Sequence, residues 1–183
     1  MRMHATEFVG TIDGQNVPPV VVLVGAEGLL VRQSAAAIAR AVLGEQGEED
    51  LSRRNGGDNT WRDIHDELAT VSMFADRRVV LVEDAEQFIK QNRSTLEEYV
   101  AAPVKKSVLI LQPKSFPGNT RLAKAVKASG AVVECTALEG AALLRWLGGI
   151  AGEQHAIELT RDAASLLVEL VGSNLAQLES ELA

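Results

Sequence analysis

Four short apolar runs constrain the fold of this chain most strongly. They are rich in Val, Ile and Leu, show little alternation with polar residues, and occupy Pro19–Val24, Val79–Val82, Val108–Leu111 and Ala131–Val133. Such unbroken runs predict strands that are buried on both faces. Longer segments with apolar residues at helical spacing lie between the runs, namely Leu29–Leu43, Glu86–Val100 and Thr120–Ser129. Strands that alternate with helices predict an α/β fold with a mostly parallel sheet covered on both faces.

The pattern changes after Thr136. Three segments without an intervening strand read as helices, namely Gly140–Ile150, Thr160–Val171 and Asn174–Leu182. Thr160 is a favourable N-cap residue, and Gly172 lies just past the end of the same helical segment. We therefore expect an α/β domain over residues 1–137 and a small helical domain over residues 138–183. The last helical segment reaches Ala183 without a stop signal, so we expect the chain to be cut inside that domain.

One polar stretch between the predicted elements has two interpretations. Residues Gly44–Asn59 are loop-like and carry several acidic side chains, which favours a solvated connection. Within this stretch, Leu51–Asn55 is either a further, weaker strand or plain loop.

The composition narrows the classes of function. The formal charge is −7, whereas a domain that grips a phosphate backbone by itself is usually basic, so we expect at most weak or indirect contact with DNA. Cys135 is the only cysteine, and His4, His65 and His155 are widely spaced, so no metal site is predicted. No apolar run has the length that spans a bilayer, which favours a cytoplasmic protein with no membrane contact.

A degenerate phosphate loop follows the first apolar run. Gly25 and Gly28 lie between a predicted strand and a predicted helix, where a nucleotide-binding loop has its glycines, although Leu30 occupies the position of the second one. Such a loop also needs a lysine that reaches the phosphates and a Ser or Thr hydroxyl that holds magnesium. Val31 and Arg32 occupy these two positions, so no nucleotide or other cofactor is expected.

An acidic pair follows the second run in a similar way. Glu83 and Asp84 come directly after Val79–Val82, where an NTPase carries its magnesium-binding carboxylates. Their order is reversed, and carboxylates at strand ends are common on solvated rims. The degenerate loop and the acidic pair correspond to the two halves of a nucleotide site and follow one another in the usual order along the chain. Together they indicate an NTPase-like fold that has lost its nucleotide chemistry.

Several stretches together resemble the delta subunit of the bacterial DNA polymerase III clamp loader. The first begins at Trp61-Arg62-Asp63-Ile64, and the most specific is Val71-Ser72-Met73-Phe74-Ala75-Asp76-Arg77-Arg78 with the strand after it. Later matches include Leu144-Arg145-Trp146-Leu147 and the segment Ala163–Glu181. The order and spacing of these stretches carry the resemblance, which covers essentially the whole chain from Val20 onward.

The resemblance implies a RecA-like AAA+ domain without ATP binding, followed by a helical lid, and a collar domain that is missing from this chain. It further implies that an exposed hydrophobic pair, Met73 and Phe74, binds the β sliding clamp and opens one interface of the ring for loading onto primed DNA. Other partners would be the motor and delta-prime-like loader subunits, contacted through the collar. The subunit itself would be non-catalytic within the polymerase holoenzyme.

Other interpretations stay open at this point. Without the resemblance, one of Met73 and Phe74 would pack inward while the other caps the sheet. Trp61 and Trp146 are interpreted as packing residues. The helical stripe of Arg121, Lys124 and Lys127 is a solvated face or a weak contact with DNA or a subunit. The rival functions are an active P-loop NTPase and a delta-prime-like or motor subunit, although residues 112–118 lack the Ser-Arg-Cys motif of those subunits.

Overall fold

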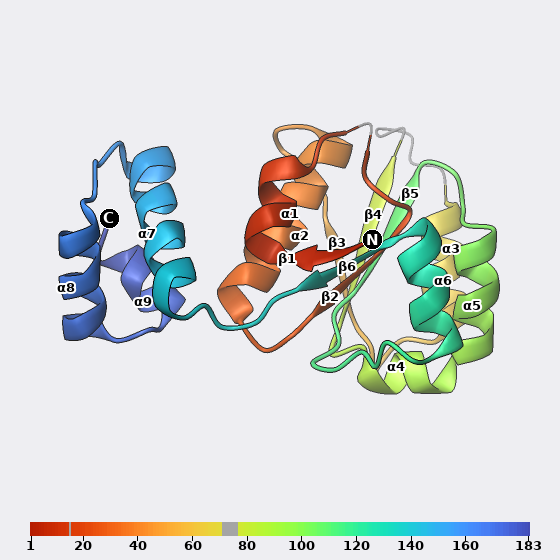
Figure 1. Cartoon of the computed structure of the whole chain (residues 1–183). Coiled ribbons are helices and arrows are strands. Elements are labelled where there is room, and N and C mark those ends of the chain that lie inside the picture. The colour runs from red at the N-terminus through yellow and green to blue at the C-terminus, as the bar shows by residue number, and fades with distance from the viewer. Residues whose placement is uncertain (15, 71–76) are drawn as a thin grey trace. The chain divides into compact units, whose positions relative to one another are not determined.

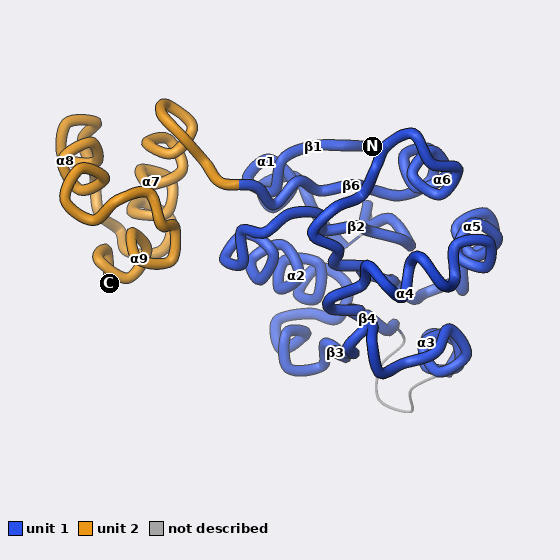
Figure 2. The backbone as a smooth tube through the Cα atoms, turned by 90° about the horizontal axis from the view of Figure 1, so that it is seen from below, with its two compact units in different colours: residues 1–136 blue, residues 137–183 orange. Residues whose placement is uncertain are grey.

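A computed structural model describes residues 1–14, 16–70 and 77–183 of the chain (Figure 1). These residues form two compact units, Met1–Thr136 and Ala137–Ala183, which Figure 2 distinguishes by colour. The boundary between the units lies where the sequence changes from alternating strands and helices to helices alone.

The first unit is built on one sheet whose strands all run parallel. Its six strands follow the order β1-β6-β2-β5-β4-β3. They are β1 (Arg2–His4), β2 (Val20–Val24), β3 (Ser52–Asn55), β4 (Arg78–Glu83), β5 (Ser107–Leu111) and β6 (Ala131–Glu134). The register places Val21 opposite Ile110 on one side and Ala131 on the other. The predicted α/β fold with a parallel sheet is confirmed.

Helices cover both faces of this sheet. They are α1 (Ala5–Thr11), α2 (Gly28–Leu43), α3 (Trp61–Ala69), α4 (Glu86–Gln91), α5 (Arg93–Ala101) and α6 (Arg121–Ser129). Helices α1 and α2 lie against one face, whereas α3, α5 and α6 lie against the other (Figures 1 and 2). This arrangement explains why the central strands read as unbroken apolar runs, since neither face meets water.

Alternate strand residues divide the core between the two faces. One apolar cluster joins helix residues such as Phe88, Leu96 and Val126 to every second residue of three strands, namely Val20, Val22, Val80, Val82, Leu109 and Leu111. The intervening residues, such as Leu23 and Leu81, are equally buried. This two-residue period is the ordinary alternation of a strand, and here both sets are apolar.

Three local features differ from the pattern that the sequence indicates. Strand β1 and helix α1 were not predicted, because Arg2–His4 contains no apolar run; this edge strand depends on pairing with β6. The helix expected over Glu86–Val100 is divided at Asn92, whose side-chain amide donates to the carbonyl oxygen of Phe88 (2.9 Å). Such a side-chain hydrogen bond competes with the backbone hydrogen bonds of the helix. The open choice at Leu51–Asn55 resolves as strand β3.

The second unit consists of α7 (Gly140–His155), α8 (Arg161–Val171) and α9 (Leu175–Ser180). Its buried apolar residues are Leu138, Leu143, Leu147, Ile150, Ala151, Ala164, Leu175, Leu178 and Leu182. The start signal at Thr160 is correct, because its hydroxyl accepts a hydrogen bond from the Ala163 amide (3.3 Å). Helix α7 is about a turn longer than predicted. Among the described residues, no helix combines the length and apolar character needed to cross a membrane.

Candidate functional site

The turn between β2 and α2 occupies the position of a phosphate loop. All strands are parallel, so this turn lies at the carboxyl edge of the sheet, where α/β proteins of this kind bind ligands. Gly25 has a φ of 139°, and a Cβ atom there would overlap the carbonyl oxygen of Cys135. Only glycine fits this close approach of two backbones.

Two backbone amides of this turn donate to carbonyl oxygens elsewhere in the chain. Gly25 N donates to the carbonyl oxygen of Pro113 (3.2 Å), and Glu27 N donates to that of Cys135 (3.0 Å). The Glu27 carboxylate accepts from Leu29 N (3.3 Å) and thereby caps α2. A phosphate loop directs such amides at its ligand. Here a carboxylate of the chain itself occupies the positive end of the helix, where an incoming phosphate would meet repulsion.

The two positions that should carry nucleotide chemistry are filled differently. Val31 stands at the lysine position and packs in the core with 6% exposure, and the exposed Arg32 stands at the hydroxyl position. The turn therefore offers neither an ammonium group for the phosphates nor a hydroxyl ligand for magnesium. Its geometry is that of a structural connection between β2 and α2.

The acidic pair after β4 is also engaged in structural contacts. The Glu83 carboxylate forms an ion pair with Arg53 of β3 (3.2 Å), and the Glu83 carbonyl oxygen accepts from Gly56 N (2.8 Å). Asp84 is exposed and has a φ of 48°, so it forms the turn into α4. Among the residues that the structure describes, no group of three or more His, Cys, Asp or Glu side chains could hold a metal ion.

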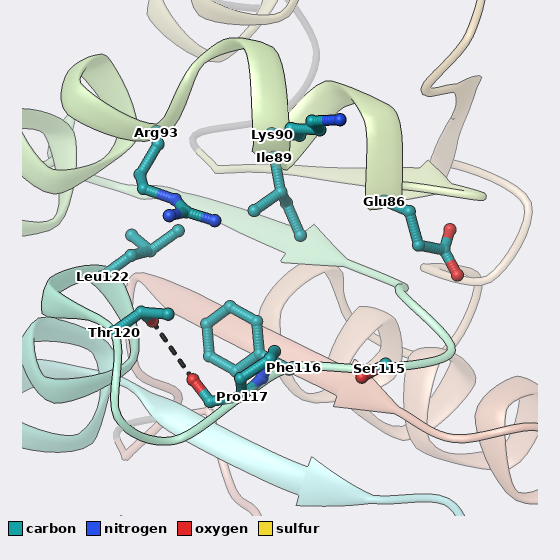
Figure 3. Close-up of a pocket in the computed structure, with 9 residues that line it drawn as sticks. All are labelled: Glu86, Ile89, Lys90, Arg93, Ser115, Phe116, Pro117, Thr120 and Leu122. Carbon is teal, nitrogen blue, oxygen red and sulfur yellow. Dashed lines mark hydrogen bonds between the residues drawn. The ribbon is translucent and has the colours of Figure 1, made fainter.

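A small hollow lies beside this edge, between α4 and the segment after β5 (Figure 3). Its volume is about 150 Å³, and apolar side chains of Ile89, Phe116 and Leu122 line it. Phe116 is buried, while Lys90 of α4 and Arg93 of α5 lie on the opposite side of the hollow. The Phe116 side chain thus anchors the segment after β5, which includes residues 112–118.

The link between α3 and β4 enters at the opposite, amino edge of the sheet. The predicted pair Met73 and Phe74 belongs to this link and lies outside the described residues, which stop at Thr70 and resume at Arg77. Both flanks of the link are fixed. The Arg77 guanidinium donates to the carbonyl oxygen of Gly14 (2.8 Å), and the buried Ser107 hydroxyl donates to that of Leu68 (2.7 Å).

Glu67 connects the elements on both sides of the link. Its carboxylate accepts from the Ser52 hydroxyl (2.5 Å) and from two nitrogens of Arg54 (2.8 and 3.2 Å), and Arg78 lies 3.8 Å away. These residues come from α3, β3 and the first position of β4. The ion-pair network Ser52–Arg54–Glu67–Arg78 therefore holds the end of α3 against the start of β4.

The surroundings of Glu67 favour its ionised form. Partial burial by itself raises the pKa of the Glu67 carboxyl. Hydrogen bonds from Arg54 and Ser52, together with the charges of Arg54 and Arg78, outweigh that effect and leave the pKa below its usual value. Glu67 is thus a charged anchor at neutral pH.

A family model described as "DNA polymerase III, delta subunit" matches residues 22–136, which is more than half of the chain. This chain belongs to the DNA polymerase III delta-subunit family. The matched residues include the β2–α2 turn, the Glu67 network and the α3–β4 link. No curated protein matches the sequence.

Solved structures share the fold of this delta-family chain. The Bacillus subtilis DNA clamp loader delta protein (YqeN) matches with a TM-score of 0.77 and 22% identity, over 97% of this chain and 55% of that one. The Thermotoga maritima RuvB Holliday junction branch migration motor matches with a TM-score of 0.52 and 10% identity, over 97% of this chain and 58% of that one. These identities show the fold alone, a RecA-like AAA+ unit followed by a small helical unit. The chain spans little more than half the length of either protein.

Other residues singled out in this delta-family sequence have plain structural surroundings. The Trp61 ring packs edge-on against that of Tyr99, with centroids 5.2 Å apart, so its interpretation as a packing residue is confirmed. Arg121, Lys124 and Lys127 are exposed along α6 and form no ion pair with any described residue. This exposure fits a solvated face, and the alternative contact stays a prediction.

Sequence reasoning missed the contacts that fix the two edges. The capping role of Glu27 could not be predicted from the sequence, because a side-chain cap at the end of a glycine-containing turn depends on backbone geometry. Glu67 and Arg54 are 13 residues apart, and their pairing depends on β3. The doubtful strand at Leu51–Asn55 was therefore the only available signal for this network.

Proposed function

We propose that this chain is the clamp-binding part of a clamp-loader delta subunit. It has no catalytic site of its own, and it binds the β sliding clamp through Met73 and Phe74 and favours the opened ring, in which form the ring is loaded onto primed DNA. The family match over residues 22–136 carries this proposal, since it includes the α3–β4 link. The proposal places the protein in the cytoplasm with motor and delta-prime-like subunits as partners, and DNA only as a weak or indirect contact.

The arrangement of the two sheet edges supports this function. At the carboxyl edge, two amides of the β2–α2 turn donate to the carbonyl oxygens of Pro113 and Cys135, and the Glu27 carboxylate caps α2, which leaves little capacity for nucleotide. At the amino edge, the link that carries Met73 and Phe74 is held at both flanks by Arg77 and the Glu67 network. Fixed flanks restrict the conformations of a link, and this lowers the entropy lost when a partner binds.

The decisive experiment truncates the pair. In the double variant Met73→Ala/Phe74→Ala, two large apolar contacts are lost, and interface anchors of this kind commonly contribute about 2 kcal/mol or more each. We expect clamp affinity to fall by about 30-fold per residue, with less than full additivity because neighbours share a pocket. Surface plasmon resonance with immobilised β clamp measures the affinity. Release of closed clamps from circular DNA tests ring opening, which requires stronger binding to the open ring than to the closed one.

A matched control removes two exposed apolar side chains elsewhere. Leu166 and Leu170 of α8 are 56% and 74% exposed, so Leu166→Ala/Leu170→Ala makes a similar change without touching the link. We expect this variant to bind and unload clamps as the parent does. Equal clamp binding by Met73→Ala/Phe74→Ala and the parent would refute the proposal. Unfolding of that variant would show instead that the pair belongs to the core.

A further inference from the structure

The helical second unit has an unusual distribution of charge. Residues 137–183 contain seven Asp and Glu side chains but only two basic residues, Arg145 and Arg161, and no lysine, which gives a formal charge of −5. In such a unit, arginines would be expected to pair with nearby carboxylates. Neither arginine forms an ion pair with any residue that the structure describes.

Both arginines line the same pocket, which lies wholly within this unit. Its volume is about 310 Å³, and its other lining residues are all apolar: Ala141, Leu144, Leu159 and Ala164. Ala141, Leu144 and Arg145 lie at positions i, i+3 and i+4 of α7 and so share one face. Arg161 begins α8, and Ala164 lies one turn further on that helix.

The turn between the two helices completes the pocket. Ala156 adopts a left-handed conformation with a φ of 55°, and Ile157 N donates to the carbonyl oxygen of Ala151 (2.9 Å). This closure turns the chain back toward α8 and presents Leu159 to the pocket. The walls therefore come from three consecutive parts of one compact unit, and α7 and α8 pack directly against each other (Figure 1).

We propose that this pocket, defined by Arg145 and Arg161, binds an extended acidic segment of a partner protein that inserts one large apolar side chain. The apolar walls suit that side chain, while the two guanidinium groups suit carboxylates on either side of it. The Asp and Glu side chains of the unit add specificity, because an acidic segment meets favourable side-chain charge only at these two arginines.

The lining favours a peptide over a nucleotide. A nucleobase is commonly held by stacking on an aromatic ring, and none of the six lining residues is aromatic. A nucleoside triphosphate also carries more negative charge than the two arginines neutralise, and the formal charge of the unit, −5, opposes the excess. A peptide with one or two carboxylates carries no more negative charge than the two arginines can neutralise.

The test uses the whole chain labelled with ¹⁵N and three acetylated, amidated pentapeptides. The probe is Ser-Asp-Leu-Asp-Ser; Ser-Asn-Leu-Asn-Ser removes its charge, and Ser-Asp-Ser-Asp-Ser removes its apolar side chain. We expect the probe to shift the amide signals of Leu144, Leu159 and Ala164 saturably, with a dissociation constant of about 1 mM or tighter. Each control peptide should bind about tenfold more weakly.

Variants connect that signal to the two arginines. Arg145→Gln and Arg161→Gln should each weaken probe binding about tenfold, since each removes a charge-assisted hydrogen bond. Arg40→Gln makes the same change at an exposed arginine of the first unit and should leave binding unchanged. The shifts of folded amide signals report the fold of each variant in the same spectra.

Four results would overturn the proposal. The first is the absence of saturable shifts up to about 10 mM probe, and the second is a set of shifts that maps to the first unit. The third is probe binding by the two arginine variants that equals binding by the parent, and the fourth is equal occupation of the pocket by inorganic phosphate. The last result would define a simple anion site. The assay contains no sliding clamp, so its outcome is independent of the function proposed for Met73 and Phe74.

Discussion

Replacing Glu67 by glutamine tests whether the ion-pair network at the amino edge stabilises the fold. The carboxylate is 14% exposed, Arg78 is 28% exposed and Arg54 is 46% exposed, so the network lies between a buried and a surface ion pair. A hydrogen bond to a charged group contributes about 1.5–3 kcal/mol, whereas an exposed ion pair contributes about 0–1 kcal/mol. Glutamine keeps one acceptor oxygen for Ser52 or Arg54. We expect Glu67→Gln to lower the free energy of unfolding by about 1–2 kcal/mol at pH 7.

The pH dependence follows from the direction of the pKa shift. The pKa of the Glu67 carboxyl is lower in the folded chain than in the unfolded chain, so the ionised form stabilises the fold. That contribution is complete above the unfolded pKa of about 4.3 and is lost as the pH falls through the folded pKa. Urea unfolding of the parent and of Glu67→Gln at several pH values should show a difference that is largest at neutral pH and disappears in acid.

A neighbouring residue on α3 provides the control. Asp66 pairs with Arg62 at 3.7 Å, and both side chains are largely exposed, at 69% and 88%. Asp66→Asn should therefore change the free energy of unfolding by less than about 0.5 kcal/mol. If Glu67→Gln is as stable as the parent at pH 7, or if its deficit is the same at pH 3, the network does not act as an ionised anchor.

Three further predictions concern the carboxyl edge. Gly25→Ala should destabilise the chain by about 3 kcal/mol or more in urea unfolding, because a Cβ atom at a φ of 139° would overlap the Cys135 carbonyl oxygen; near-parental stability would show that the turn can rearrange. Burial raises the pKa of the Cys135 thiol to about 12, so a thiol reagent should label it only at the rate of unfolding, and rapid labelling of the folded chain would contradict its burial. Calorimetric titration with magnesium–ATP should give no saturable heat, because Glu27 caps α2 and Val31 replaces the lysine; a dissociation constant below about 100 µM would refute this.

The sequence predicts the fold well where burial alone determines the pattern. Val79–Val82 and Val108–Leu111 have no solvent-facing side, so their composition indicates central parallel strands without further information. Strand β1 depends on an existing edge of β6, so its own residues carry no such pattern. The break at Asn92 depends on one side-chain hydrogen bond, which competes with a helical pattern that continues through it.

The candidate site is less predictable than the fold, and the two edges differ in this respect. The missing lysine at Val31 is visible in the sequence, because a phosphate loop requires particular residue types at fixed positions. The backbone contacts of the turn are not visible in the sequence, because they join distant residues, such as Glu27 N and the Cys135 carbonyl oxygen. Met73 and Phe74 were singled out through family resemblance and stay a prediction.

Under the proposed function, mutations at the two edges of the sheet should separate stability from recognition. At the carboxyl edge, the Gly25 and Glu27 amides bind the segments that directly follow β5 and β6, so a substitution there breaks backbone contacts that position these segments. At the amino edge, the contacts that hold the flanks of the α3–β4 link involve Leu68, Arg77 and Ser107, none of which lies within residues 71–76. Substitutions within the link can therefore change what the chain binds while the contacts of its flanks persist. If the proposed function is correct, clamp affinity and unfolding free energy should vary independently across variants of the link, whereas variants of Gly25 should lower both together.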